Sequence, residues 1–208
     1  MGRPSKAEAR DTRREILDAA LDLFAEGGFF GTSTRQIARA VGVRESALYH
    51  HFPSKDAILE EILEELGARK LEALKHVDLG VVARVGLDQV LRTFVQSVLE
   101  EWATPRERKF MRLIMTEGPR LAPRSSVNLP AFIERMLQTM AGFFAQLMEK
   151  GLVRRRNPEV AAIELMAPVM MMRIRFMVMP PGPVDMKRVR ALAEEHVKYF
   201  WESMRPQK

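Results

Sequence analysis

The sequence predicts an all-α protein of about nine helices, and two observations carry that prediction. Apolar residues recur at i, i+3 and i+4 spacing along most of the 208 residues, which is the pattern of a helix with one buried face. No run alternates apolar and polar residues over a length typical of a strand. Clusters of glycine and proline separate the helical segments, as at Gly27-Gly28 and at Pro180–Pro183.

The N-terminal part is predicted to contain three helices that are separated by short turns. Residues 11–27 carry an apolar stripe that stops at a pair of glycines. A second helix opens with Ser33 or Thr34 as its N-cap and ends at Gly42. A third, short helix covers residues 44–51.

The rest of the chain is predicted to form longer helices, with a break at residues 118–123 where glycine and prolines cluster. These helices are expected at residues 55–75, 81–103, 105–116, 129–149, 158–179 and 185–204. We therefore expect two domains, 1–54 and 55–208, with the helix at 55–75 as their connector.

Composition excludes several classes of protein. The chain has no cysteine, which rules out a disulfide scaffold, a cysteine nucleophile and a thiolate metal site. The polar N-terminus contains no apolar core of a signal peptide. The most apolar stretch, residues 165–179, is too short to span a bilayer and contains Arg173 and Arg175. We expect a cytoplasmic protein that needs no cofactor and makes no membrane contact.

The most informative segment is TRQIARAVGVRESALYHHF, residues 34–52. Two short helices are joined there by a turn that holds a glycine. Ile37 and Ala38 face inward on the first helix and Leu48 faces inward on the second. This is the arrangement of a helix-turn-helix, whose second helix can enter the major groove of DNA.

At these residues the sequence resembles the DNA-binding domain of TetR-family transcriptional regulators. The resemblance rests on TSTRQIARAVGVRESALYHHFPSKDAIL and on the preceding ILDAALDLFAEGGFFGTST, so it covers about residues 10–65. It implies an all-helical homodimeric repressor that binds a palindromic operator in double-stranded DNA. It also implies that a small molecule entering the C-terminal domain releases the DNA.

The resemblance assigns the recognition helix to residues 44–51 and gives two groups of DNA-contacting residues. Those expected to face bases or the adjacent sugar-phosphate are Glu45, Ser46, Ala47, Tyr49 and His50. Those expected to contact phosphate are Thr34, Arg35, His51 and Lys55. Lys55 also starts a helix, where positive charge and free amides suit a phosphate.

Two residues depart from the family pattern. Arg44 stands where a capping serine or threonine is common, so a phosphate contact is expected to replace the capping bond. Glu45 can accept a hydrogen bond from cytosine N4, but it repels phosphates, and it can instead serve the helix dipole. Tyr49 can pack on the domain surface rather than on DNA. The first 14 residues have a net charge of +3, so they form either a phosphate-attracting arm or a solvated tail.

No catalytic or metal-binding motif accompanies these features. The sequence has neither G-x-S-x-G nor a phosphate-binding P-loop. His50 and His51 are neighbours and point about 100° apart on a helix, so they do not share a metal. We expect a protein that is not an enzyme. The alternative reading is an all-helical enzyme, or a small-molecule-binding protein, with a cavity in residues 81–180.

Methionine and aromatic residues concentrate in the C-terminal domain, where they suit either a plain core or a cavity for a small apolar effector. The candidate effector-binding residues are Phe94, Trp102, Phe110, Met111, Met115, Met140, Phe144, Met170 and Arg173. Arg173 and Arg175 lie in an apolar run and need partners. These partners are either glutamates across a dimer or the anionic head group of an effector.

The helix at 158–179 is apolar almost all round, so it must be covered on more than one side. We expect one side to face its own domain and the other a second copy of the chain. The helix at 185–204 would complete a four-helix dimer contact. Its contact residues are expected to be Val189, Leu192, Val197, Tyr199 and Phe200. Pro168 is expected to kink the first of these helices.

Overall fold

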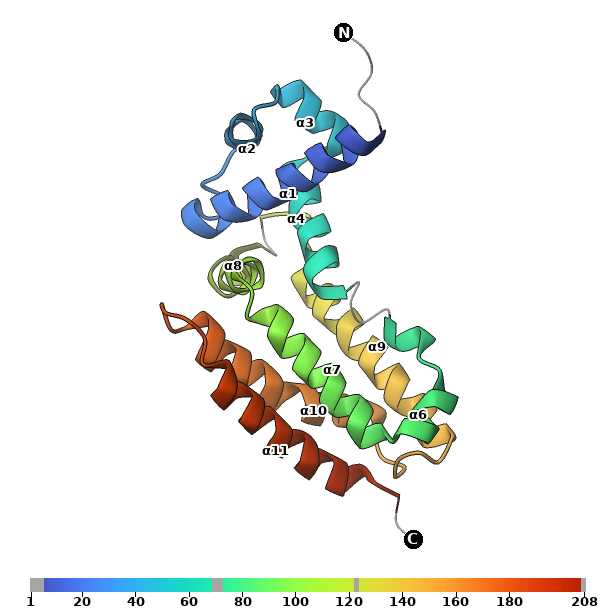
Figure 1. Cartoon of the computed structure of the whole chain (residues 1–208). Helices are drawn as coiled ribbons and strands as arrows, with labels where there is room; N and C mark the ends of the chain where they lie inside the picture. Colours follow the sequence, from blue (N-terminus) through green and yellow to red (C-terminus); the bar gives the residue numbers. More distant parts are fainter. Residues whose placement is uncertain (1–5, 69–72, 122–123, 207–208) are drawn as a thin grey trace. The chain divides into compact units, whose positions relative to one another are not determined.

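The computed structural model describes residues 6–68, 73–121 and 124–206, and Figure 1 shows that these residues are almost entirely helical. They form 10 α-helices, two π-helical turns and one 3₁₀ turn, without a strand. The predicted all-α class is confirmed. No helix of this described part is long and apolar enough to cross a membrane.

The chain folds as two compact units. The first contains the described residues up to Gly67 together with Lys109–Leu129, and the second contains Ala68–Arg108 and the described residues from Pro130 onward. The first unit is therefore larger than the predicted domain of residues 1–54. It also takes in the start of the predicted connector and most of one helix from the middle of the chain.

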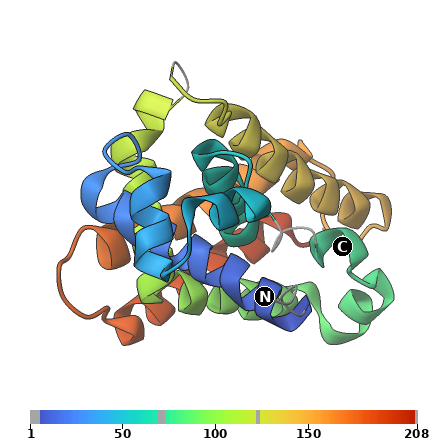
Figure 2. The ribbon, with the colours of Figure 1, turned by 90° about the horizontal axis from the view of Figure 1, so that it is seen from above.

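The first unit is built around four helices whose bounds are α1 (Lys6–Gly27), α2 (Thr34–Val41), α3 (Glu45–His51) and α4 (Lys55–Leu63). They appear as one blue-to-teal group in the view from above (Figure 2), where α1 packs on α2 and α4, and α2 packs on α3. The side chains at the centre are fully or almost fully buried. They include Ile16, Phe24, Ile37, Leu48, Phe52 and Ile58.

Local caps fix the two helices of the predicted helix-turn-helix. Ser33 is the N-cap of α2, and its hydroxyl accepts from the backbone N–H of Gln36 at 3.2 Å. The Gln36 side chain in turn accepts from the Ser33 N–H at 2.8 Å, so a complete capping box opens α2. Gly42 ends α2 in the left-handed region with φ 75°, where glycine carries no Cβ penalty. The turn into α3 is thus set by residues within the motif.

Part of the predicted basic arm has a structural role. The Arg13 guanidinium lies 4.2 Å from the Phe52 ring centroid and donates to the carbonyl of His51 at 2.9 Å. It also pairs with Glu61 of α4 at 3.3 Å. Arg13 therefore ties α1 to the end of α3 and to α4, and its charge is already compensated.

The second unit contains five further helices and the first residues of another. Their bounds are α6 (Leu79–Val85), α7 (Leu87–Trp102), α9 (Leu129–Glu149), α10 (Pro158–Met172) and α11 (Met186–Met204), with α8 (Pro105–Leu121) divided between the units after Arg108. Helices α7 and α10 both pack against α11, and α7 runs beside it in Figure 1. Phe144, Leu165 and Val197 are among the buried residues of this core.

Three predicted helices differ from those observed. The connector is α-helical only to Leu63 and continues as a π-helical turn, Glu64–Ala68; its residues 69–72 lie outside the described part. The predicted helix 81–103 is split at Gly86, whose φ is 94°. The predicted helix 158–179 changes at Arg173 into a π-helical turn, Arg173–Val178. In each case the apolar periodicity predicted helicity but not the local change of winding.

The predicted break at residues 118–123 is wrong for residues 118–121, and residues 122–123 lie outside the described part. Helix α8 continues through Gly118 and Pro119 to Leu121. A proline inside a helix removes one hydrogen bond, yet Glu117 and Leu121 on either side of Pro119 are both buried. Tertiary packing of this turn therefore outweighs the local breaker signal.

Candidate nucleic-acid interface

Helix α3 has one buried side and one exposed side. Leu48 is 0% exposed beneath the helix, whereas Tyr49 is 47% exposed. Glu45, Ser46 and His50 are also exposed, and Ala47 is partly buried. The N-cap position is held by Arg44, which is exposed and makes no side-chain capping bond. The residues predicted to face DNA bases are thus gathered on the open side of α3.

A small polar network, Thr34–Glu45–Tyr49, links the start of α2 to α3. The Thr34 hydroxyl donates to the Glu45 carboxylate at 2.8 Å and lies 3.2 Å from the Tyr49 hydroxyl. Because a threonine hydroxyl has only one proton, Tyr49 is the donor in the second bond. The network fixes the directions of Glu45 and Tyr49, and the sequence pattern did not predict it.

An open groove of about 470 Å³ lies beside this network, next to the first residues of α2 and α4. Hydroxyl groups dominate its lining, with Ser33, Thr34, Tyr49 and Ser54 among the contributors. Two helix N-termini in one place suit the oxygens of a phosphate. Ser33 and Thr34 donate their hydroxyl protons to Gln36 and Glu45, so Ser54 is the serine of this group that can donate to a phosphate.

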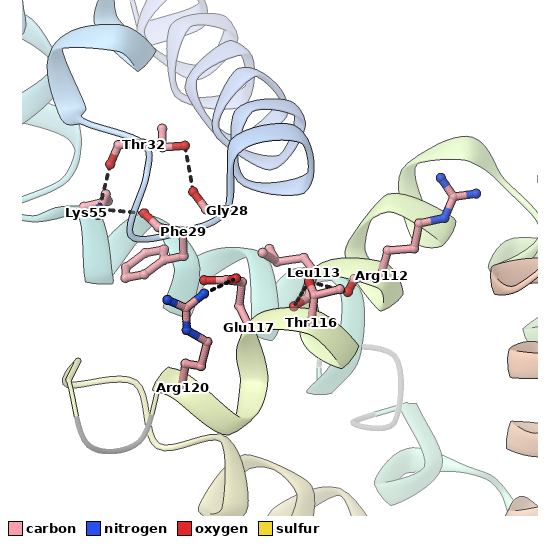
Figure 3. A network of polar contacts seen from close by, with 9 residues as sticks. All are labelled: Gly28, Phe29, Thr32, Lys55, Arg112, Leu113, Thr116, Glu117 and Arg120. Carbon is pink, nitrogen blue, oxygen red and sulfur yellow. Dashed lines mark hydrogen bonds and ion pairs between the residues drawn. The ribbon is translucent and has the colours of Figure 1, made fainter.

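Lys55 lies at this groove, but its ammonium group is already engaged (Figure 3). It donates to the backbone carbonyls of Phe29 at 2.7 Å and Thr32 at 2.6 Å, and it lies 4.4 Å from the Phe29 ring centroid. Burial lowers the pKa of Lys55, although neighbouring Asp56 raises it. An ammonium has three donors, so at most one remains for the predicted phosphate contact.

The turn between α1 and α2, residues 28–33, is held from several sides. The buried Thr32 hydroxyl interacts with the carbonyl of Gly28 at 2.9 Å, as Figure 3 shows. A Cβ on Gly31 would overlap the carbonyl oxygen of Gly27, so glycine is required there. From α8, the Glu117 carboxylate lies against Gly28 and accepts from Arg120 at 3.3 Å. The turn that Lys55 clamps is therefore closely fixed, and it leads directly into the capping box of α2.

The remaining predicted phosphate residues differ in exposure. Arg35 is exposed, and Thr34 and His51 are partly buried. Burial, followed by the charges of Arg13 and His50, lowers the pKa of His51. The His51 imidazole is therefore neutral at pH 7, and it offers a phosphate one N–H rather than a positive charge.

The second unit contains a cavity of about 450 Å³, lined by residues of α6, α7, α9 and α10 and by Leu74 and Val77. Of the predicted effector-binding residues, Phe94 and Met140 line it. The other seven predicted effector-binding residues do not line the cavity. They lie in the packed core, on the part of α8 that belongs to the first unit, or in an ion pair. These residues are Trp102, Phe110, Met111, Met115, Phe144, Met170 and Arg173.

Arg173 has its partner within the same chain. It donates to the Glu107 carboxylate at 2.8 Å and to the Glu107 carbonyl at 3.2 Å, and its guanidinium lies 4.4 Å from the Trp102 ring. Both side chains of the ion pair are almost fully buried. Burial lowers the pKa of Arg173 while Glu107 raises it. Both predicted partners of Arg173, a glutamate across a dimer and an anionic effector, are therefore wrong. Its partner is Glu107 of the same chain.

The predicted dimer residues of the last helix divide into two groups. Val189, Val197 and Phe200 are buried in the core of their own unit, so they are not available to a second chain. Leu192 and Tyr199 are exposed. The apolar periodicity of this helix therefore predicted mainly the face that packs against its own chain.

Within the described residues, no group of three or more histidine or acidic side chains could hold a metal ion. The candidate site is the exposed side of α3, which Leu48 anchors from beneath. Gly42, in the left-handed conformation, joins α3 to α2, which a capping box opens. These features define a helix-turn-helix DNA-binding protein.

Comparison with known families refines this class. Residues 16–62 match the family described as bacterial regulatory proteins of the TetR family, and residues 89–203 match the AefR-like transcriptional repressor C-terminal domain. The chain therefore belongs to the TetR family of bacterial transcriptional regulators.

Individual relatives agree with this assignment. The transcriptional regulator AcrR of Shigella flexneri is 36% identical over 117 residues, which are 55% of this chain and 53% of the relative. The repressor KstR2 of Rhodococcus jostii is 51% identical over 51 residues, 24% of this chain and 25% of the relative. The chain spans about half the length of several curated relatives, including SrpR of Pseudomonas putida at 52%.

Solved structures share the fold along nearly the whole chain. Salmonella enterica GusR has a TM-score of 0.72 at 28% identity, covering 93% of this chain and 95% of its own. The complex of SmeT with triclosan has a TM-score of 0.69 at 24% identity and covers 95% of this chain and 93% of its own. At that identity, SmeT supports the fold alone.

Proposed function

We propose that the chain is a cytoplasmic repressor that binds a palindromic operator as a dimer and is released from DNA by a small apolar effector. The observation that carries this proposal is the polar network Thr34–Glu45–Tyr49 on the open side of α3. It holds two groove-reading side chains in fixed directions before DNA arrives, which reduces the ordering cost of binding.

Base reading is assigned to the exposed side of α3. Glu45 accepts a hydrogen bond from a cytosine amino group, while Ser46, Tyr49 and His50 contact neighbouring base edges or sugars. The Glu45 carboxylate also repels phosphates, so it contributes more to the choice of sequence than to affinity for any duplex.

Phosphate binding is assigned to the hydroxyl-lined groove and to the surrounding arginines. Ser54 presents a hydroxyl near the N-terminus of α4, and free amides at the N-termini of α2 and α4 add to the attraction for an anion. The hydroxyl protons of Ser33 and Thr34 are already donated to Gln36 and Glu45. The exposed Arg35 and Arg44 supply full positive charges. These contacts orient α3 in the groove without reading sequence.

Dimerisation is assigned to an apolar surface on α10 and α11. Large hydrophobic side chains are exposed there although the two helices pack on each other. They are Val160, Ile163, Met171, Leu192 and Tyr199, with Met171 59% and Tyr199 63% exposed. Exposed apolar side chains grouped on neighbouring helices are typical of protein interfaces. Ile163→Asp should therefore yield a monomer in sedimentation experiments, with helical content unchanged.

The effector is assigned to the cavity of the second unit, whose volume lies within the range of small-molecule sites. Among the fold relatives, SmeT is known in complex with triclosan. An effector releases DNA when it binds better to a state of the dimer whose recognition helices no longer match successive major grooves.

The proposal is tested by fluorescence anisotropy with the DNA that lies upstream of the protein's own gene. Wild type is expected to bind a palindromic duplex at least about 1000-fold more tightly than a scrambled one. Tyr49→Ala should lose about 1–3 kcal/mol of this specific binding, while its melting temperature and dimer state stay unchanged. Equal affinity of the wild type for both duplexes would contradict the proposed function.

A further inference from the structure

The cavity of the second unit has a deep wall of buried apolar side chains. Leu91, Met140, Phe143 and Leu165 line it from α7, α9 and α10, and all four are almost inaccessible to solvent. Aromatic rings and a flexible methionine thioether can adapt to a flat apolar body. This wall therefore favours the hydrophobic part of a ligand.

Among the described residues that line this cavity, none has an acidic or basic side chain. Arg173, predicted as an effector-binding residue, is not in the lining and is held by Glu107 and Trp102 instead. Moving an unpaired charge from water into an apolar site is costly. A ligand whose charged group entered the buried part would find no counter-ion on the described side chains there.

The exposed edge of the cavity carries neutral polar groups on one face of α7. Gln89, Thr93 and Ser97 all line the cavity and are exposed. They are spaced four residues apart, so they lie one above the other along the helix. The Gln89 amide donates to the Thr93 hydroxyl at 3.4 Å. Amide and hydroxyl groups can donate to or accept from an uncharged polar group.

We propose that this cavity binds an uncharged, largely apolar molecule whose single hydrogen-bonding end lies against Gln89, Thr93 and Ser97. The identification of this molecule with the effector rests on the proposed function above. The apolar body lies against Met140, Phe143 and Leu165, and the polar end stays close to solvent. Carboxylates and sulfonates of similar size bind more weakly, because the described part of the lining provides no cation.

Two fluorescent probes that differ in one group test this assignment on the full-length protein. N-phenyl-1-naphthylamine is neutral, and 1-anilinonaphthalene-8-sulfonate is the same ring system with a sulfonate. Titration should give a saturable fluorescence increase with the neutral probe and at least about tenfold weaker binding of the sulfonate. Equal or tighter binding of the sulfonate, or no binding of the neutral probe, would overturn the proposal.

A matched pair of variants locates the probe. Thr93→Lys places a cation at the polar edge, on an exposed position where folding is not at risk, and should strengthen sulfonate binding about tenfold. Thr116→Lys adds the same charge at an exposed threonine of the first unit and should leave both affinities unchanged. If the two variants have the same effect, the probe is not in this cavity and the proposal is wrong.

DNA release is measured separately, by adding the neutral probe to the protein–operator complex. Loss of DNA binding supports both the ligand class and the effector role. Probe binding in the cavity without loss of DNA supports the ligand class and contradicts the effector role in the proposed function. The two claims can therefore fail independently.

Discussion

The exposed surface of α3, which we propose as the recognition surface, and the cavity of the second unit are built in different ways. The recognition surface depends on neighbours in sequence: a capping box, a glycine turn and a network within residues 33–49. The cavity combines side chains from four helices spread over residues 74–165. A surface held by local contacts keeps its geometry under many distant changes, whereas a cavity assembled from distant segments depends on the packing of its whole unit.

The largest expected effect concerns the buried ion pair of the second unit. Glu107→Gln leaves the Arg173 charge buried without its counter-ion and should lower the free energy of unfolding by about 3–5 kcal/mol. Glu100→Gln breaks an exposed pair with Arg190, which has the same 2.8 Å separation, and should cost less than about 1 kcal/mol. Urea unfolding of both variants measures the difference. Similar losses of unfolding free energy in the two variants would mean that burial of the Glu107–Arg173 pair does not increase the cost of breaking it.

Lys55 provides the sharpest test within the first unit. Because its ammonium is engaged with the carbonyls of Phe29 and Thr32, Lys55→Met should reduce stability by about 1–3 kcal/mol and weaken DNA binding. The slope of log affinity against log salt should stay nearly unchanged. Arg35→Met should lower that slope by about 1.8, which is about 0.9 for each of the two copies in the dimer, without loss of stability. If Lys55→Met lowers the slope equally, Lys55 is a phosphate ligand rather than a residue that positions the turn.

A smaller effect is expected at the polar network. Thr34→Val keeps the shape of the side chain but removes the bonds to Glu45 and Tyr49. Operator affinity should fall by about 1 kcal/mol, or roughly fivefold, because Glu45 and Tyr49 lose their fixed directions. Affinity for scrambled DNA should change much less. An unchanged ratio of operator to scrambled affinity would show that the network plays no part in specificity.

The smallest effect is the pH dependence that comes from His51. Its pKa is lowered in the folded protein, so the unfolded chain binds the proton more readily. Stability from this group is therefore present above about pH 6.5 and decreases as the pH falls through 6.5 toward the folded pKa. His51→Asn should flatten this part of the stability curve in thermal melts at pH 5.5 to 7.5. A steeper curve in the variant would reverse the assigned sign.

The sequence predicted the local structure of the helix-turn-helix better than the lining of the cavity, for a physical reason. Ser33, Gly42 and Leu48 act on residues within a few positions along the chain, so motif and periodicity locate them. The engagement of Lys55 depends on where the carbonyls of Phe29 and Thr32 point in a folded turn. No local pattern records that direction.

The predicted lining of the cavity differs from the observed one for the same reason: no local sequence pattern records which distant residues meet. Phe110, Met111 and Met115 have the composition of a ligand site, but they lie on the part of α8 that belongs to the first unit. The polar edge at Gln89 and Thr93 was missed, because neutral polar residues on a helix usually face solvent. Composition indicates which residue types suit a cavity, while the meeting of distant helices decides which of them line it.

The most direct test of the central claim is selection of duplexes from a random DNA pool by the purified wild-type protein. If two α3 helices of a dimer read bases, the enriched sequences should form an inverted repeat. Its half-site centres should lie about 10 base pairs, or a multiple of that, apart. Tyr49→Ala should weaken the enrichment. Recovery of no common sequence by the wild type, or of the same repeat with undiminished enrichment by Tyr49→Ala, would contradict the assignment of α3 as the reading helix.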